Sequence, residues 1–162
     1  MCGIQGWIAK PEQVQSDLRV MAHRGPDDTG MIRLATRDGG YAIGLAHNRL
    51  SILDLSPAGH QPMSDRKCTL WVSFNSEIYN YPELARELGA CSHHFRSRSD
   101  AEVLLHGYEE WGGRLPERLR GMFAFALWDA AQERLLLARH RSVALPLALP
   151  TTTAVAIAPD AG

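Results

Sequence analysis

The second residue of the chain is the first candidate for covalent chemistry. Cys2 stands directly after Met1 and before Gly3, so removal of Met1 would leave a first residue with both a thiol and a free α-amine. A thiol is only a few per cent ionised near neutral pH, and an α-amine with a pKa of about 7.7 to 8.0 can accept its proton. Cys2 is therefore a candidate N-terminal nucleophile. The alternative is a small, half-buried residue at the start of a strand.

A second candidate group lies after an apolar segment. Residues 75–80 read Asn-Ser-Glu-Ile-Tyr-Asn and follow the strand predicted over 69–74. The side-chain amide of Asn75 and the next main-chain N–H could converge there on a developing oxyanion and stabilise a tetrahedral intermediate. An Asn-rich turn that satisfies its own backbone is the other interpretation of these residues.

Two charged residues could bind the ends of an amino-acid ligand. Arg49 precedes the apolar run 50–53, and a guanidinium there could clamp a carboxylate with two parallel hydrogen bonds. Asp100 could pair with an ammonium group. Each also has a structural interpretation, Arg49 as a surface residue and Asp100 as a negative charge favoured in the first turn of a helix.

Metal and nucleotide sites are not expected. His93 and His94 together with His106 invite a metal-binding interpretation, but adjacent side chains of a strand point to opposite faces. The glycines at 39, 40 and 44 do not open a helix after a strand, as a phosphate-binding loop requires. The sequence therefore predicts no metal and no cofactor in this chain.

The candidate residues would be positioned by strands and helices in alternating groups. Three segments have helical spacing or helix-start signals, and Ser99 with Glu102 has the spacing of a capping box. The predicted helices cover residues 11–23, 81–88 and 99–111. The predicted strands cover 3–9, 31–36, 41–46, 69–74, 122–128 and 134–138, with hairpins around 38–40 and 129–133. This order predicts an α+β layered sandwich with a partly antiparallel sheet.

Composition narrows the class of protein. The 162 residues are 45% hydrophobic and 22% charged with a formal net charge of -1, so the chain has no general field for nucleic acid or an anionic membrane. Its three cysteines have no spacing typical of a zinc or redox pair, and no stretch of about 18 apolar residues could span a bilayer. We expect a single soluble domain in a reducing cytoplasm, with no nucleic-acid or membrane partner.

The composition changes near the C-terminus. Residues 143–162 contain six Ala, three Pro and three Thr, and Asp160 is their only charged residue. Neither helical nor strand periodicity continues there, so residues 140–162 are predicted to form an irregular Ala/Pro/Thr-rich tail.

The order of several motifs over residues 1–139 resembles the class II glutamine amidotransferase domain, an N-terminal-nucleophile hydrolase. The motifs occupy residues 1–4, 23–27, 46–52, 61–62, 74–80, 99–100 and 121–125. Arg-Gly-Pro-Asp at 24–27 and Arg-Leu-Ser-Ile at 49–52 look like asparagine synthetases. Amidotransferases of natural-product pathways and of cell-surface sugar synthesis share this pattern, so the final ammonia acceptor stays open.

The resemblance implies a four-layer αββα sandwich with mostly antiparallel sheets and a role for each candidate residue. Cys2 would attack the side-chain amide of L-glutamine, release ammonia and form a thioester that water hydrolyses to glutamate. Asn75 and the N–H of Ser76 would form the oxyanion hole. The glutamine itself would be bound by Arg49 at its carboxylate, by Asp100 and Glu77 at its amino end, and by a pocket lining of Leu50, Ser51, Ile52 and Leu53.

Two departures from the family pattern bear on activity. The family has Gly where this chain has Ser76, which would be strained at a positive φ. After residues 137–139 the chain no longer follows the family sequence and continues as the tail. This departure suggests truncation before an ATP-pyrophosphatase synthetase domain. ATP and Mg²⁺ would then belong only to that missing domain, on the same or a separate chain. A catalytically silent remnant that binds glutamine or a partner protein is the alternative, and the oligomeric state stays open.

Overall fold

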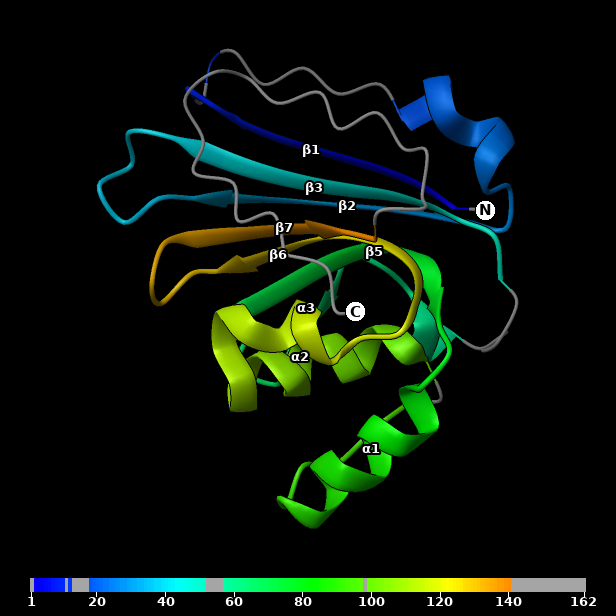
Figure 1. Ribbon diagram of the computed structural model, residues 1–162. Coiled ribbons are helices and arrows are strands. Elements are labelled where there is room, and N and C mark those ends of the chain that lie inside the picture. Colours follow the sequence, from blue (N-terminus) through cyan, green and yellow to red (C-terminus); the bar gives the residue numbers. More distant parts are fainter. Residues whose placement is uncertain (1, 11, 13–17, 52–56, 98, 141–162) are drawn as a thin grey trace.

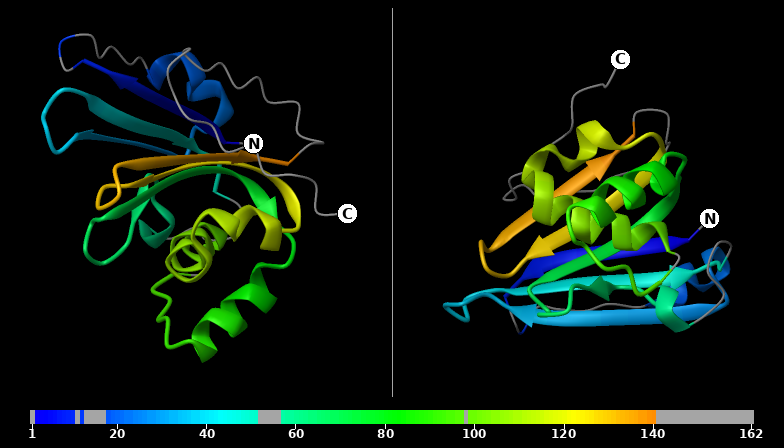
Figure 2. Two further views of the ribbon diagram at one scale, coloured as in Figure 1. Left: turned by 60° about the vertical axis from the view of Figure 1, so that its left-hand side comes forward. Right: turned by 90° about the horizontal axis from the view of Figure 1, so that it is seen from below.

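The architecture is a stack of two antiparallel sheets with helices on one side. The computed structural model describes residues 2–10, 12, 18–51, 57–97 and 99–140. In the described residues, the strand order is β1-β3-β2 in one sheet and β4-β5-β6-β7 in the other. The helices α2 and α3 cover the face of the second sheet that points away from the first, and α1 packs against α2 farther from the sheet (Figure 1, Figure 2).

The first sheet is built around a fully buried central strand. It consists of β1 (Gly3–Ala9), β2 (Asp28–Ala35) and β3 (Ala42–Arg49), and all eight residues of β3 are buried. The predicted turn at 38–40 joins β2 to β3. Gly44 of β3 lies under the indole of Trp7, because a Cβ at this position would be 1.9 Å from the ring. The glycine therefore allows the indole to lie flat against the central strand.

The second sheet buries both of its faces. It consists of β4 (Met63–Ser64), β5 (Leu70–Ile78), β6 (Gly121–Asp129) and β7 (Arg134–Arg139). Side chains alternate between faces along β6. Phe125 and Leu127 belong to the core under the helices, whereas Ala126 and Trp128 pack with Ile43 and Leu45 of the first sheet. Two hydrophobic cores therefore share this sheet as their common wall.

Short helices complete the described chain. The α-helices are α1 (Tyr81–Ala90), α2 (Asp100–Trp111) and α3 (Leu115–Arg118), and the 3-10 helices are η2 (Leu18–Arg24), η3 (Pro57–Gly59) and η4 (Gly112–Arg114). Ser99 caps α2, because its hydroxyl accepts a hydrogen bond of 3.3 Å from the Ala101 N–H. Glu102 does not close the predicted capping box. Its carboxylate accepts instead from the N–H groups of Arg96 and Ser97 in the preceding loop.

The α+β class and the antiparallel layering are confirmed, as are the strands and the helices predicted over 81–88 and 99–111. The described residues form three of the four expected layers, one helical and two of sheet. The helix predicted over 11–23 is represented by η2, a 3-10 helix, while residues 13–17 lie outside the described part. The predicted tail from residue 141 onward lies outside it as well. None of the described helices is long and apolar enough to cross a membrane.

Replacement of Gly121 by Ala should destabilise the fold at the start of β6. Gly121 has φ 145° and pairs with Ile78, and a Cβ there would be 2.1 Å from the Glu77 carbonyl oxygen. We expect a loss of at least about 1 to 3 kcal/mol in the free energy of unfolding, measured in urea. Gly89→Ala in α1 is the matched control, because nothing lies within 4 Å of the position that its Cβ would take. That variant should be about 0.5 to 1 kcal/mol more stable, and equal stability of both variants would contradict the prediction.

Candidate active site

The thiol of Cys2 lies against the backbone of Leu50. The Leu50 N–H donates a hydrogen bond of 3.3 Å to the sulfur, and the Leu50 carbonyl oxygen lies 3.6 Å from it. This contact forms because β1 and β3 are antiparallel, with Gly3 opposite Asn48, so that residue 2 reaches the segment just beyond the end of β3. Cys2 is half-buried and is a free cysteine. The geometry therefore fixes the position of the thiol and leaves it open to a ligand.

The segment that holds the thiol is itself held by the loop 24–27. A Cβ at Gly25 would be 2.2 Å from the Asn48 carbonyl oxygen, so only glycine allows this loop to pack on the end of β3. The Asp27 N–H donates to the Arg49 carbonyl at 3.0 Å, and the Asp27 carboxylate accepts from the Ser51 N–H at 2.8 Å. The loop thus shapes the backbone on both sides of Leu50.

Arg49 is buried at the last position of β3, with 8% of its surface exposed. Its guanidinium lies over Gly59, where a Cβ would be 2.1 Å from Nη2. Because Leu50 follows Arg49 directly, the guanidinium and the thiol are anchored to adjacent residues. The interpretation of Arg49 as a surface residue is wrong, since the side chain packs between the end of β3 and η3.

Polar contacts between the sheets bring the end of β5 close to the end of β3, where Cys2 and Arg49 lie. The Ser73 hydroxyl donates to the Ala46 carbonyl at 3.1 Å, and His47 Nε2 lies 3.0 Å from the Phe74 carbonyl. Residue numbers increase in the same direction along β3 and β5 at this contact, so both strands end on the same side of the sandwich (Figure 2). The Gln61 side chain supports this arrangement by accepting from the Phe74 N–H at 2.8 Å.

The imidazole of His47 is a neutral part of this contact. It is 1% exposed, and burial lowers its pKa to about 4. Nε2 therefore carries the hydrogen that the Phe74 carbonyl accepts, and Nδ1 is left without a hydrogen-bond partner among the described residues. Protonation of His47 on acidification would place an uncompensated charge between the two sheets.

Asn75, Ser76 and Glu77 lie within β5 and not after it, which corrects the predicted strand end. The ladder continues to Ile78 because β6 pairs with every residue of β5 from Leu70 onward. Asn75 is 5% exposed. Ser76 pairs with Phe123 in this ladder.

Asp100 is a buried carboxylate beside the end of β5. It is 6% exposed and accepts a hydrogen bond of 3.3 Å from the Ile78 N–H. Burial raises the pKa of this carboxyl group to about 6, and the nearby charge of Glu77 raises it further, against hydrogen bonds from the backbone that lower it. A ligand ammonium group would compensate both negative charges.

The structure gathers the described site residues at one end of the sandwich in two groups. Cys2, Arg49, Leu50 and Ser51 are held by the first sheet, and Asn75, Ser76, Glu77 and Asp100 by the second sheet and α2. Ile52 and Leu53 lie outside the described residues. Sequence reasoning assigned no role to Asp27, Gly59, His47 or Gln61. Asp27, His47 and Gln61 lie within the motifs and Gly59 lies between two of them, but the sequence gives no further signal because their partners are distant in sequence.

Replacement of Asp100 by Asn should stabilise the protein at neutral pH. A carboxyl pKa raised from 3.8 to about 6 means that the folded state binds its proton more tightly than the unfolded chain. The wild type therefore loses stability as pH rises between these values. We expect the Asp100→Asn variant to have the higher unfolding temperature at pH 7.5 and to lose this advantage by about pH 4. Thermal melts across this pH range test the raised pKa of Asp100. A gain in the unfolding temperature of the variant that did not change with pH would contradict it.

Comparison with known proteins places these residues in context. The sequence matches the family described as "Glutamine amidotransferase domain" over residues 1–159. It is 37% identical to asparagine synthetase [glutamine-hydrolyzing] 3 of Bacillus subtilis, over 87% of this chain and 23% of that protein. It is 41% identical to asparagine synthetase B [glutamine-hydrolyzing] of Escherichia coli, over 80% of this chain and 22% of that protein. The chain thus spans less than a quarter of the length of these relatives.

Among solved structures, the chain is similar to the glutamine phosphoribosylpyrophosphate amidotransferase from B. subtilis complexed with ADP and GMP. The match has a TM-score of 0.45 and 23% identity, and it covers 57% of this chain and 22% of that one.

Proposed function

Because this chain belongs to the glutamine amidotransferase domain family, we propose that it hydrolyses L-glutamine to glutamate and ammonia through a thioester on Cys2. The observation that carries the proposal is the placement of the Cys2 thiol. It is held at 3.3 Å from the Leu50 N–H, next to the buried Arg49 and at the end of the sandwich where Asn75 and Asp100 lie. An amino acid with a side-chain amide has charges that complement those of Arg49 and Asp100.

Binding would use the two ends of the substrate. The Arg49 guanidinium would clamp the α-carboxylate of glutamine, and Asp100 with Glu77 would bind its α-ammonium group. Both acidic groups lie at the second sheet, whereas Arg49 lies at the first. The substrate would therefore bridge the two sheets, with its side-chain amide directed to Cys2.

The reaction would proceed in two acyl-transfer steps. After removal of Met1, the α-amine of Cys2 takes the thiol proton, and the sulfur attacks the amide carbon to give a tetrahedral oxyanion. The buried amide of Asn75 would donate to this oxyanion together with the Ser76 N–H. Collapse breaks the C–N bond, and the amine returns the proton to the departing ammonia. Water then attacks the thioester, and glutamate leaves as the free thiol reforms.

The consumer of the ammonia is a further part of the proposal. The matched relatives from B. subtilis and E. coli are named glutamine-hydrolysing asparagine synthetases, and the match spans less than a quarter of each. We propose that the ammonia passes to a synthetase domain, on the same or another chain, which would activate an acid acceptor with ATP and Mg²⁺.

An electrophilic diazoketone analogue of glutamine should label Cys2 and no other cysteine. Cys68 and Cys91 are exposed free cysteines and serve as internal controls for simple thiol reactivity. Intact and peptide mass spectrometry should show one adduct, on a chain that begins at Cys2, and none in Cys2→Ala. Retention of Met1 in the purified protein, or equal labelling of Cys68, would contradict an N-terminal nucleophile.

Replacement of Arg49 by Lys should weaken glutamine binding. An ammonium group cannot reproduce a bidentate clamp, and a lost charge-assisted hydrogen bond costs about 1.5 to 3 kcal/mol, or roughly 10- to 150-fold in Kd. Titration calorimetry in a Cys2→Ala background measures binding without turnover. Arg114→Lys in η4 is the control, since Arg114 is exposed. An unchanged Kd for Arg49→Lys would remove Arg49 from the binding site.

A further inference from the structure

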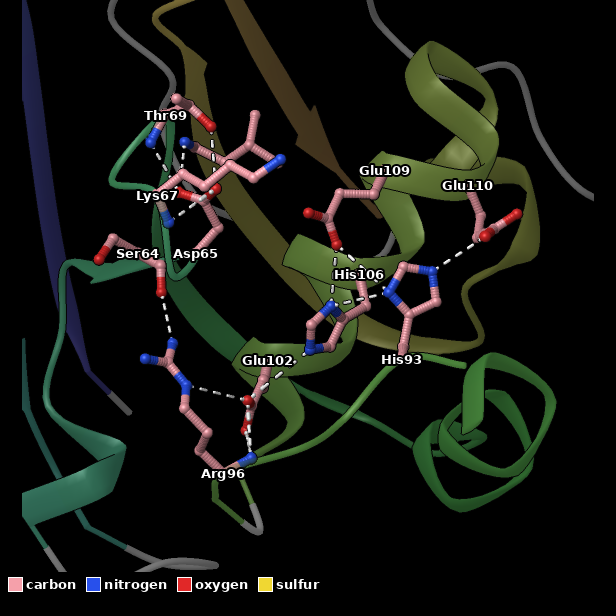
Figure 3. Close-up of polar contacts among 11 residues, drawn as sticks. Ser64, Asp65, Lys67, Thr69, His93, Arg96, Glu102, His106, Glu109 and Glu110 are labelled. Carbon is pink, nitrogen blue, oxygen red and sulfur yellow. Dashed lines mark hydrogen bonds and ion pairs between the residues drawn. The ribbon is translucent and has the colours of Figure 1, made fainter. Parts of the chain in front are cut away.

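Two histidines and a glutamate form a cluster at α2 and the loop that precedes it, away from the proposed active site. His93 comes from the loop after α1, and His106 and Glu109 come from α2 (Figure 3). Three atoms converge, with His93 Nδ1 3.1 Å from His106 Nδ1, and Glu109 Oε2 2.9 Å from His106 Nδ1 and 3.3 Å from His93 Nδ1. Helices cover the face of the second sheet that points away from β1 and β3, so this cluster belongs to a different layer from Cys2.

The other nitrogen of each imidazole faces a carboxylate. His93 Nε2 lies 2.9 Å from Glu110 Oε1, and His106 Nε2 lies 3.7 Å from Glu102 Oε1. The carboxylate of Glu110 places the hydrogen of the His93 ring on Nε2 and leaves the lone pair on Nδ1. His106 Nε2 has no hydrogen-bond partner among the described residues and is free to carry the hydrogen of its ring. In that tautomer two Nδ1 lone pairs and a carboxylate oxygen face one point, which is an arrangement that a cation stabilises.

The cluster is held in place by contacts that do not involve a cation. The His93 N–H donates to the Leu88 carbonyl at 3.1 Å, directly after Ser92, whose φ is 69°. The Phe95 ring packs edge-on against His106, with centroids 4.9 Å apart. His106 and Glu109 are one turn apart on α2 and therefore lie on the same face. The two sides of the cluster are thus positioned independently and meet with their donor atoms already converging.

From this geometry we propose that His93, His106 and Glu109 bind a divalent transition-metal ion, for which Zn²⁺ is the best candidate. Ligands about 2.0 to 2.1 Å from Zn²⁺ in tetrahedral geometry are about 3.3 Å apart, close to the separations found here. Two imidazoles with one carboxylate favour Zn²⁺ over Mg²⁺ and Ca²⁺, which prefer oxygen ligands. The ion would tie the loop after α1 to α2 and keep one coordination position for water.

The sequence did not predict this site, although it contains two of the three histidines that were considered. His94 is exposed and is not part of the cluster, although residues 93 and 94 lie in a loop and not in the strand on which the argument from adjacent side chains depended. Glu109 supplies the third ligand in its place. The pairing of His93 with a residue 13 positions later depends on the turn that ends α1.

Metal binding can be measured directly on the full chain after treatment with a chelator. Titration with Zn²⁺ against a chromophoric chelator should give one site per chain, and Co²⁺ should give the visible bands of a low-symmetry complex. Glu109→Gln and His93→Ala should weaken Zn²⁺ binding by more than the roughly 10- to 100-fold that loss of an outer carboxylate costs. Glu110→Ala should fall within that range, and His94→Ala should bind as the wild type does.

Further measurements test two alternatives to this metal site. In one, the three side chains share only a proton, and in the other the metal ion binds to a cysteine. At about 100 times its Kd, Zn²⁺ should raise the unfolding temperature of the wild type by roughly 5 to 10 °C, and it should have little effect on Glu109→Gln. Cys2→Ala should bind Zn²⁺ normally, so the result does not depend on glutaminase activity. Equal affinity in Glu109→Gln and wild type would overturn the proposal and leave a proton as the shared cation. Sulfur-to-Co²⁺ charge-transfer bands that vanish in Cys91→Ser would overturn it as well.

Discussion

The register between the two sheets is set by buried polar atoms, and the proposed active site depends on that register. The Ala46 carbonyl and the Phe74 carbonyl, from opposite sheets, are each satisfied by a side chain of the other sheet. An unsatisfied buried group costs about 1 to 3 kcal/mol, so sliding one sheet along the other would lose both contacts at once. Apolar packing alone would allow several offsets. These two hydrogen bonds select the offset that places the ends of β3 and β5 together.

Much of the fold could be predicted from local patterns. The strands, both hairpins and the start of α2 depend on alternation, turn residues and the Ser99 cap, which are properties of neighbouring residues. The end of β5 could not be predicted in this way, because its last residues are extended through pairing with β6, more than 40 residues later. The roles of Asp27 and Gln61 were missed for the same reason. Their partners, Ser51 and Phe74, are set by the tertiary structure.

The candidate site residues came from local residue chemistry and from a family pattern, and the structure adds physical reasons for several of them. Asp100 occupies the first turn of α2, where a negative charge is favourable, but it is buried beside Glu77 and its carboxyl pKa is raised to about 6. A residue chosen only for helix stability would be exposed. Burial of this carboxylate reduces the stability of the fold at neutral pH, and a cationic ligand group at the proposed binding site would offset that cost.

Gly59 illustrates a role in recognition for a residue with no side chain. The volume that a Cβ would fill there is occupied by the guanidinium of Arg49. In a saturation mutagenesis experiment, changes at this position would displace Arg49 and resemble changes at Arg49 itself, although the two residues are ten positions apart. Selection on the proposed contact of Arg49 with a ligand carboxylate would therefore also act on position 59, where the guanidinium takes the place of a side chain. Sequence variation at position 59 would then report on the substrate range of related proteins as well as on their backbone geometry.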